Sequence, residues 1–166
     1  MIRGMILAVV FGALAASGAT AQQVPSRARV WGAAGVGAGV PTSGGDGITN
    51  MVQLVFQKEP HHAAIRALVL HDLDRGTNEI GEVGPLYGRM QQRKWGHVTL
   101  ASGVSAVAFD TCPSDDDTCF AIGLPLVAEA VLSRRFIGLG IQAFGNVNRK
   151  ASYAGATLFL ALGRMR

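Results

Sequence analysis

The sequence carries little charge, and this shortage limits the classes of protein to which it can belong. Asp, Glu, Lys and Arg together make up 16% of the 166 residues, whereas soluble globular proteins average about 25%. The basic residues form no compact cluster of the kind that nucleic acid requires, so no nucleic-acid partner is expected. The surface that this protein presents has to explain why so few charges are needed.

Long apolar runs are also scarce, and the marked one lies at the N-terminus. Arg3 precedes an uncharged apolar stretch from Met5 to Ala16, and small residues follow at Ala19 and Ala21. This pattern predicts a signal peptide over 1–21 that is cleaved before the mature chain. The alternative, a membrane anchor, is disfavoured because a spanning helix needs about 20 apolar residues. We therefore expect an exported protein with a single mature domain over residues 22–166.

Cysteine is rare, with two residues in the whole chain. Cys112 and Cys119 lie in one predicted loop, and an exported protein meets an oxidising compartment. We predict a disulfide bond between them, with free thiols or a metal-binding pair as the alternatives. The loop also contains Asp115–Asp117, but it lacks the D-x-D-x-D-G pattern and the distal Glu of a calcium loop. No metal site is expected.

The mature chain is rich in residues that alternate between two kinds of side chain. Near its end, for example, Leu158 and Leu160 alternate with Thr157 and Phe159, and this period of two is typical of β-strands. No window shows a convincing helical stripe. Turn-forming residues separate the alternating segments. The eight predicted strands span residues 28–40, 50–58, 62–72, 79–90, 96–109, 119–133, 136–146 and 152–164.

An even number of strands joined by short links favours an antiparallel up-and-down barrel, because closure removes the open sheet edges. One strand face is apolar; the other is mostly Gly, Ala, Ser and Thr. As a surface in water the second face would be unusually poor in charge, whereas the narrow interior of an eight-stranded barrel suits it. We therefore predict an all-β membrane barrel whose apolar face meets lipid. The larger polar residues predicted to point inward are Gln53, Gln57, Arg66, Glu82, Glu129 and Gln142.

Three of these inward residues are charged, and a single charge is costly to bury without a partner. We hypothesise that Arg66, Glu82 and Glu129 form an ion-pair cluster in the lumen. The alternative is that they lie near strand ends and are hydrated.

The aromatic residues fall mainly near predicted strand ends. This placement is typical of the aromatic girdles that border a membrane. The residues concerned are Trp31, Tyr87, Trp95, Phe109, Phe120, Phe136 and Tyr153.

No catalytic arrangement stands out among the histidines. His61 and His62 lie beside a predicted turn, where we expect an exposed polar pair. His71 falls at a strand end and could act as a base, but a base needs a nucleophile within reach. The nearest match to a deacylase-type His-x-Ser is His97 followed by Val98 and Thr99. We expect neither an enzyme nor a cofactor.

The chain resembles the small eight-stranded outer-membrane barrels of the OmpA-barrel and OmpX-like group. The resemblance covers the mature chain through its strand number, alternation and export signal, and the ending from Gly155 is similar to the last strand of such barrels. It departs at Arg166, where these proteins usually have an aromatic residue that the barrel-insertion machinery recognises. The resemblance implies a monomer in outer-membrane lipid with a structural, adhesive or stress-related surface role, and no cofactor or soluble substrate.

A second interpretation places the same strands in a different compartment. A soluble periplasmic barrel of the lipocalin type would turn its apolar face inward, around a lipid or a small apolar ligand. The direction in which Ile122, Leu124, Leu126, Leu158 and Leu160 point distinguishes the two interpretations.

Overall fold

The computed structural model describes most of the predicted mature domain. The described residues contain no helix that is long and apolar enough to cross a membrane. The predicted signal peptide over 1–21 lies outside the described residues. These residues are 28–42, 44–73, 79–110 and 119–165.

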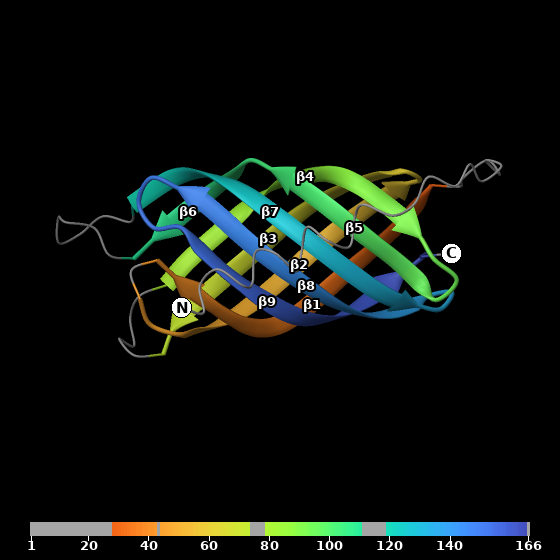
Figure 1. Cartoon of the computed structure of the whole chain (residues 1–166), viewed down its shortest axis with the longest axis horizontal. Coiled ribbons are helices and arrows are strands. Elements are labelled where there is room, and N and C mark those ends of the chain that lie inside the picture. The colour runs from red at the N-terminus through yellow and green to blue at the C-terminus, as the bar shows by residue number, and fades with distance from the viewer. Residues whose placement is uncertain (1–27, 43, 74–78, 111–118, 166) are drawn as a thin grey trace, which may run out of the picture.

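The described chain forms antiparallel strands that close on themselves (Figure 1). Each strand pairs with the next along the chain, and the first pairs with the last, so the sheet has no free edge. The predicted eight-stranded up-and-down barrel is confirmed, since β5 and β6 are two halves of one strand between β4 and β7. The strands are β1 (Arg29–Pro41), β2 (Gly47–Lys58), β3 (His61–Asp72), β4 (Glu79–Gln92), β5 (Gly96–Gly103), β6 (Ser105–Phe109), β7 (Cys119–Ser133), β8 (Ile137–Asn148) and β9 (Tyr153–Gly163).

The barrel has two different ends. At one end, which we call the terminal end, β1 begins and β9 ends, and it is the right-hand end in Figure 1. Three short turns join neighbouring strands there, at 59–60, 93–95 and 134–136. The other four links lie at the opposite end, which we call the loop end.

A pair of prolines explains why β5 and β6 are separate. The register places Pro85 of β4 opposite Val104, the residue between the two halves. Pro125 of β7 lies opposite Gly103 on the other side. Because proline has no N–H to donate, the ladder is interrupted on both flanks of one point. The register is the same on either side of this point, so the barrel wall continues.

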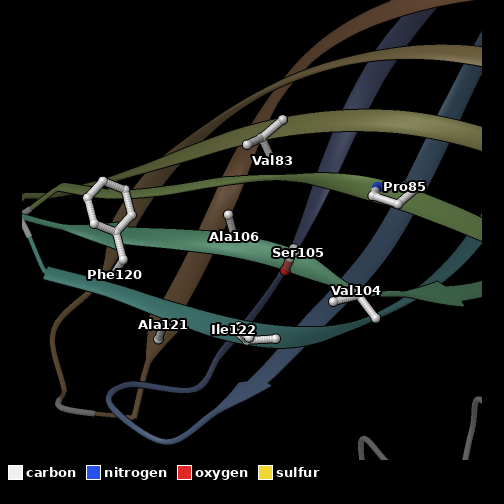
Figure 2. Close-up of a pocket in the computed structure, with 8 residues that line it drawn as sticks. All are labelled: Val83, Pro85, Val104, Ser105, Ala106, Phe120, Ala121 and Ile122. Atoms are coloured by element: carbon white, nitrogen blue, oxygen red, sulfur yellow. The ribbon is translucent and has the colours of Figure 1, made fainter.

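The interruption coincides with a shallow apolar hollow on the outer face of the barrel (Figure 2). Its volume is about 560 Å³. Ser105 is buried and reaches the hollow from the lumen side of the wall. The residues that line it are Val83, Pro85, Val104, Ser105, Ala106, Phe120, Ala121 and Ile122.

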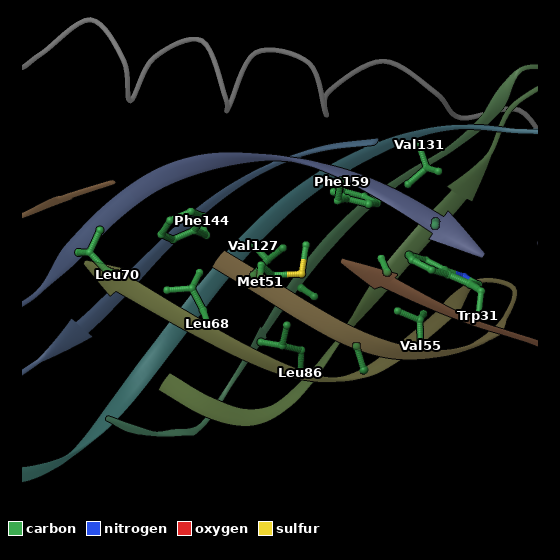
Figure 3. Packing of buried hydrophobic residues seen from close by; sticks show 14 of the residues in the cluster. Trp31, Met51, Val55, Leu68, Leu70, Leu86, Val127, Val131, Phe144 and Phe159 are labelled. Carbon is green, nitrogen blue, oxygen red and sulfur yellow. The ribbon is translucent and has the colours of Figure 1, made fainter. Parts of the chain in front are cut away.

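The strands alternate between the lumen and the outside as predicted. On β7, Ile122 and Leu124 are 77% and 57% exposed, whereas Val127 and Glu129 between outward neighbours are buried. Figure 3 shows buried side chains such as Trp31 and Phe159 inside the ring of strands. The side chains of the barrel therefore fill its centre, and its apolar rows face outward.

Glycines make room for the largest rings in this interior. Gly140 of β8 is paired with Phe159 of β9, and a Cβ added to Gly140 would lie 2.1 Å from the Phe159 ring. Phe144 and Gly155 repeat this relationship with the strands exchanged, since an added Cβ there would lie 2.6 Å from the ring. Each ring thus occupies the space that a glycine leaves free on the neighbouring strand.

The predicted aromatic girdle is wrong for three of its seven members. Trp31, Phe109 and Tyr153 are buried, because they lie on the inward phase of their strands. The other four aromatic residues are exposed, as the prediction requires: Tyr87, Trp95, Phe120 and Phe136.

Candidate functional site

Polar side chains from all around the barrel meet in its lumen, and we call this set the lumen network. Its members are buried and come from seven of the described strand segments. A glycine-rich wall gives these long side chains the space to cross the lumen. The lumen network consists of Gln53, Gln57, His62, Arg66, Glu82, His97, Ser105, Glu129, Gln142, Asn146 and Tyr153.

The centre of the lumen network is an ion pair between neighbouring strands. Arg66 Nη2 of β3 lies 2.6 Å from Glu82 Oε1 of β4, and both side chains are almost fully buried. The other terminal nitrogen, Arg66 Nη1, donates to Gln142 Oε1 at 3.2 Å. The guanidinium carbon also lies 5.7 Å from the centre of the Phe144 ring. The charge of Arg66 is therefore held by a carboxylate, an amide and an aromatic face.

The structure brings Arg66 and Glu82 together and places Glu129 one residue further away. Glu129 Oε2 accepts from Gln53 Nε2 at 2.8 Å and from Gln142 Nε2 at 3.3 Å. Gln142 thus bridges Glu129 and Arg66. The remaining carboxylate oxygen of Glu129 lies 3.6 Å from His97 Nε2. The three charged residues belong to one connected group in which a glutamine joins the two parts.

Glu82 accepts hydrogen bonds from the loop-end side of the lumen as well. Asn146 Nδ2 donates to Glu82 Oε2 at 3.0 Å, and the Tyr153 hydroxyl donates to the same oxygen. Asn146 also lies 2.8 Å from Ser105 Oγ, the hydroxyl beneath the outer hollow. A carboxylate with an arginine, an amide and a phenol around it has its lone pairs well used.

The lumen network continues toward the terminal end through two histidines. Gln57 Nε2 lies 3.2 Å from His97 Nε2 and 3.4 Å from His62 Nδ1. The His97 ring also lies 5.7 Å from the Trp31 ring, centre to centre. Polar contacts therefore run along the barrel from His62 near the terminal end to Asn146 near the loop end.

The expectation of an exposed His61–His62 pair is wrong for one of the two residues. His62 is 2% exposed and lies in the lumen. His61 is exposed and its Nδ1 lies 2.6 Å from the Tyr87 hydroxyl on the outer face. Because β3 begins at His61, the two neighbouring side chains must point to opposite faces. A strand start placed one residue earlier would have revealed this.

The lumen network links residues that neutralise and orient one another. One guanidinium, two carboxylates and two imidazoles share amide partners, an arrangement that joins six strands across the lumen. Among the described residues, no group of three or more His, Cys, Asp and Glu side chains could hold a metal ion. Such a network stabilises one barrel closure and register over others, since each partner is lost when the strands slip.

Two sequence-predicted features lie outside the lumen. His71, the possible base, pairs through Nδ1 with Glu79 Oε1 at 2.7 Å, and both side chains are largely exposed at the loop end. Cys119 begins β7, but Cys112 lies outside the described residues. The disulfide between Cys112 and Cys119 therefore stays a prediction, and the aspartates 115–117 also lie outside.

Comparison with known proteins finds a similar fold at very low sequence identity. No protein-family model matches the chain, and no curated protein matches it. The crystal structure of Neisserial surface protein A (NspA) is similar, with a TM-score of 0.63 and 10% sequence identity. The likeness covers 81% of this chain and 96% of that chain. The chain therefore shares its closed eight-stranded barrel fold with a neisserial surface protein.

Proposed function

We propose that this protein is an outer-membrane β-barrel with a structural or surface role and a filled lumen that is not a pore. The single observation that carries the proposal is the inverted distribution of side chains. Apolar residues cover the outside of the strands while the charged and amide side chains lie within. Water outside the barrel would make this arrangement unfavourable, whereas lipid makes it favourable.

The apolar rows are continuous over neighbouring strands. Ile141 of β8 pairs with Leu158 of β9, and Leu139 pairs with Leu160, so exposed side chains stand beside one another. A contiguous exposed patch of this kind marks an interaction surface. The closed ladder supports a bilayer as the partner, since lipid cannot satisfy free backbone groups. The strands, at 11 to 15 residues where unbroken, are long enough to cross when tilted.

The filled lumen argues against both a porin and a soluble carrier. Trp31, Arg66 and Phe159 are among the largest fully buried side chains, and they occupy the space that a channel would need. A lipocalin-type carrier would bury its apolar rows around a ligand. Here Leu158 and Leu160 are 61% and 50% exposed. The outward direction of these residues favours the membrane over the soluble alternative.

The proposal extends to the group of proteins and to the partners. We infer that the chain is a monomeric member of the small outer-membrane barrels of the OmpA-barrel and OmpX-like type. Its partner is the lipid of the outer membrane, and it uses no cofactor and no soluble substrate. The shared fold with a protein named as a surface protein supports this role.

Cell fractionation tests the membrane location. We expect the full chain, expressed in a Gram-negative host, to stay with the outer membrane after carbonate extraction and to migrate differently on gels before and after boiling. Recovery in the soluble periplasmic fraction without detergent would contradict the proposal. Planar bilayers with the purified barrel should show no stable conductance, and open channels would exclude a filled lumen.

Epitope accessibility tests the surface role. A tag placed after Gly44, in the β1–β2 link at the loop end, should bind antibody on intact cells. A matched tag after Lys94, in the β4–β5 turn at the terminal end, should bind only after the outer membrane is opened. The opposite pattern would reverse the orientation, and two inaccessible tags would exclude a role at the cell surface.

A further inference from the structure

Charge is distributed unequally between the two ends of the barrel. Among the described residues, the terminal end holds eight Lys and Arg residues and one acidic residue, Glu59. The charged side chains described at the loop end are more balanced, with Asp46, Glu79 and Asp110 against Arg149 and Lys150. We call the eight basic residues of the terminal end the basic collar: Arg29, Lys58, Arg89, Arg93, Lys94, Arg134, Arg135 and Arg164.

The basic collar surrounds the barrel, because its members come from most of the strands and turns at that end. Seven of the eight residues are exposed, and Arg29 is half-buried at the mouth of the lumen, where it donates to Gln92 Oε1 at 2.7 Å. A ring of cations at one level of a barrel creates a continuous positive potential around it.

Four members of the basic collar continue the apolar rows of the outer face. Exposed Lys58 follows Phe56 by two residues on β2, and exposed Arg89 follows Tyr87 by two on β4. Residues two apart on a strand point to the same side, about 7 Å from one another. In the same way Arg135 precedes Ile137, and Arg164 follows Leu162.

Aromatic residues lie at the same level as the basic collar. Trp95, which is 45% exposed, follows Arg93 and Lys94 in the β4–β5 turn, and its carbonyl accepts from the backbone of Ser133. The Arg135 guanidinium lies over the Phe136 ring at 5.1 Å. Basic side chains with aromatic neighbours at the border of an apolar belt are typical of the level of lipid headgroups.

We propose that the basic collar binds the phosphate groups of anionic phospholipids in the leaflet at the terminal end. This inference rests on the proposed membrane function, and it adds a lipid preference and a position in the bilayer. The direct continuation of apolar rows into cations favours lipid over a soluble polyanion, since the alkyl stems cover apolar surface while the charged groups reach the phosphates. The orientation proposed above assigns this leaflet to the periplasmic side.

Fluorescence quenching in vesicles measures the preference, with Trp95 as the natural probe. The barrel is reconstituted in phosphatidylcholine that contains either brominated phosphatidylglycerol or brominated phosphatidylcholine. The expected relative binding constant favours phosphatidylglycerol about threefold, and it returns to near one in about 1 M salt. A Trp95→Phe variant identifies the part of the signal that comes from Trp95, because Trp31 is buried in the lumen.

Matched variants connect the preference with the basic collar. Arg89→Gln with Arg135→Gln removes two collar charges, and the preference should fall by at least half. Arg149→Gln with Lys150→Gln removes two charges from the loop end and should leave it unchanged. Equal quenching by both lipids, or a preference that survives in the collar variant, would overturn the inference.

Two further arms separate other outcomes. Inorganic phosphate, compared with chloride at equal ionic strength, should leave the preference intact; its loss would show that the collar takes free phosphate, and the lipid assignment would be wrong. Failure of the barrel to enter any vesicle, neutral vesicles included, would contradict the proposed membrane function. Normal insertion with no lipid preference would overturn the collar inference alone.

Discussion

Arg66 and Glu82 lie on neighbouring strands with 2.6 Å between Nη2 and Oε1, and they form a fully buried ion pair in the middle of a barrel whose outside is apolar. The register pairs Arg66 with Gly84 and Glu82 with Leu68, so the two charged side chains reach toward each other diagonally. Small residues between them leave the space that this contact needs. The pair is therefore a property of the strand register as much as of the two residues.

Removal of one member of this pair should destabilise the barrel strongly. Arg66→Leu leaves the Glu82 carboxylate buried without its cation, and a loss of about 3–5 kcal/mol in the free energy of unfolding is expected. The double variant Arg66→Leu with Glu82→Leu should recover most of this loss, since no uncompensated charge is left. Urea unfolding in vesicles measures both. A double variant that is as unstable as the single would show that the pair is not the main cause.

The contact between Gly140 and Phe159 should be sensitive to a single methyl group. Gly140→Ala places a Cβ where the Phe159 ring lies, and the free energy of unfolding should fall by about 1–3 kcal/mol. Shortening the ring in Gly140→Ala with Phe159→Leu should restore part of the stability. Gly145→Ala on the same strand is the matched control, because its nearest neighbour would be 3.6 Å away. Equal losses in the two glycine variants would reject this explanation.

Arginine substitutions on β9 should depend on depth. Leu158 lies in the middle of the strand and Leu162 near its end, and both are more than half exposed. In a bilayer, Leu158→Arg should cost about 2–4 kcal/mol, whereas Leu162→Arg should cost at most about 1 kcal/mol. Unfolding in vesicles compares the two variants. Equal and small effects would indicate that water rather than lipid surrounds the outer face.

The predicted disulfide between Cys112 and Cys119 can be tested by thiol chemistry. Protein recovered from the periplasmic side of the cell should react with an alkylating reagent only after reduction, and mass spectrometry should then count two labels. The exported compartment supplies the oxidising conditions that the bond requires. Labelling of both thiols without reduction would contradict the prediction. Cys112→Ser should retain the barrel, because the loop lies beyond the strand ends.

The sequence predicted the strands and their faces because alternation is a local signal. On β7, for example, Leu124 and Leu126 on one side and Val127 and Glu129 on the other assign the face of each residue. The interruption at Val104 was not predicted, although Pro85 had weakened the prediction of its own strand. β4 is continuous, and the break falls in the neighbouring strand because the proline has removed that strand's partner.

The connections within the lumen network were less accessible to sequence reasoning. Alternation shows that Arg66 and Glu129 point inward but does not give their height along the barrel axis. That height depends on the stagger between strands that lie far apart in the chain. The roles of Gln142 and Asn146 as bridges, and the burial of His62, follow from this stagger. A pattern along one strand contains no information about it.

The pairing of β1 with β9 has a consequence for the order in which the barrel forms. Trp31 lies opposite Gly163, so the first strand finds its final partner only when the last strand has been delivered. The contacts between neighbouring strands can form locally, but this seam joins the two ends of the sequence and carries the largest loop-closure entropy. Until the seam closes, β1 and β9 both expose backbone groups that lipid cannot satisfy. A chain shortened before β9 should therefore fail to produce a smaller barrel, and should depend on holding factors in the periplasm rather than on the membrane.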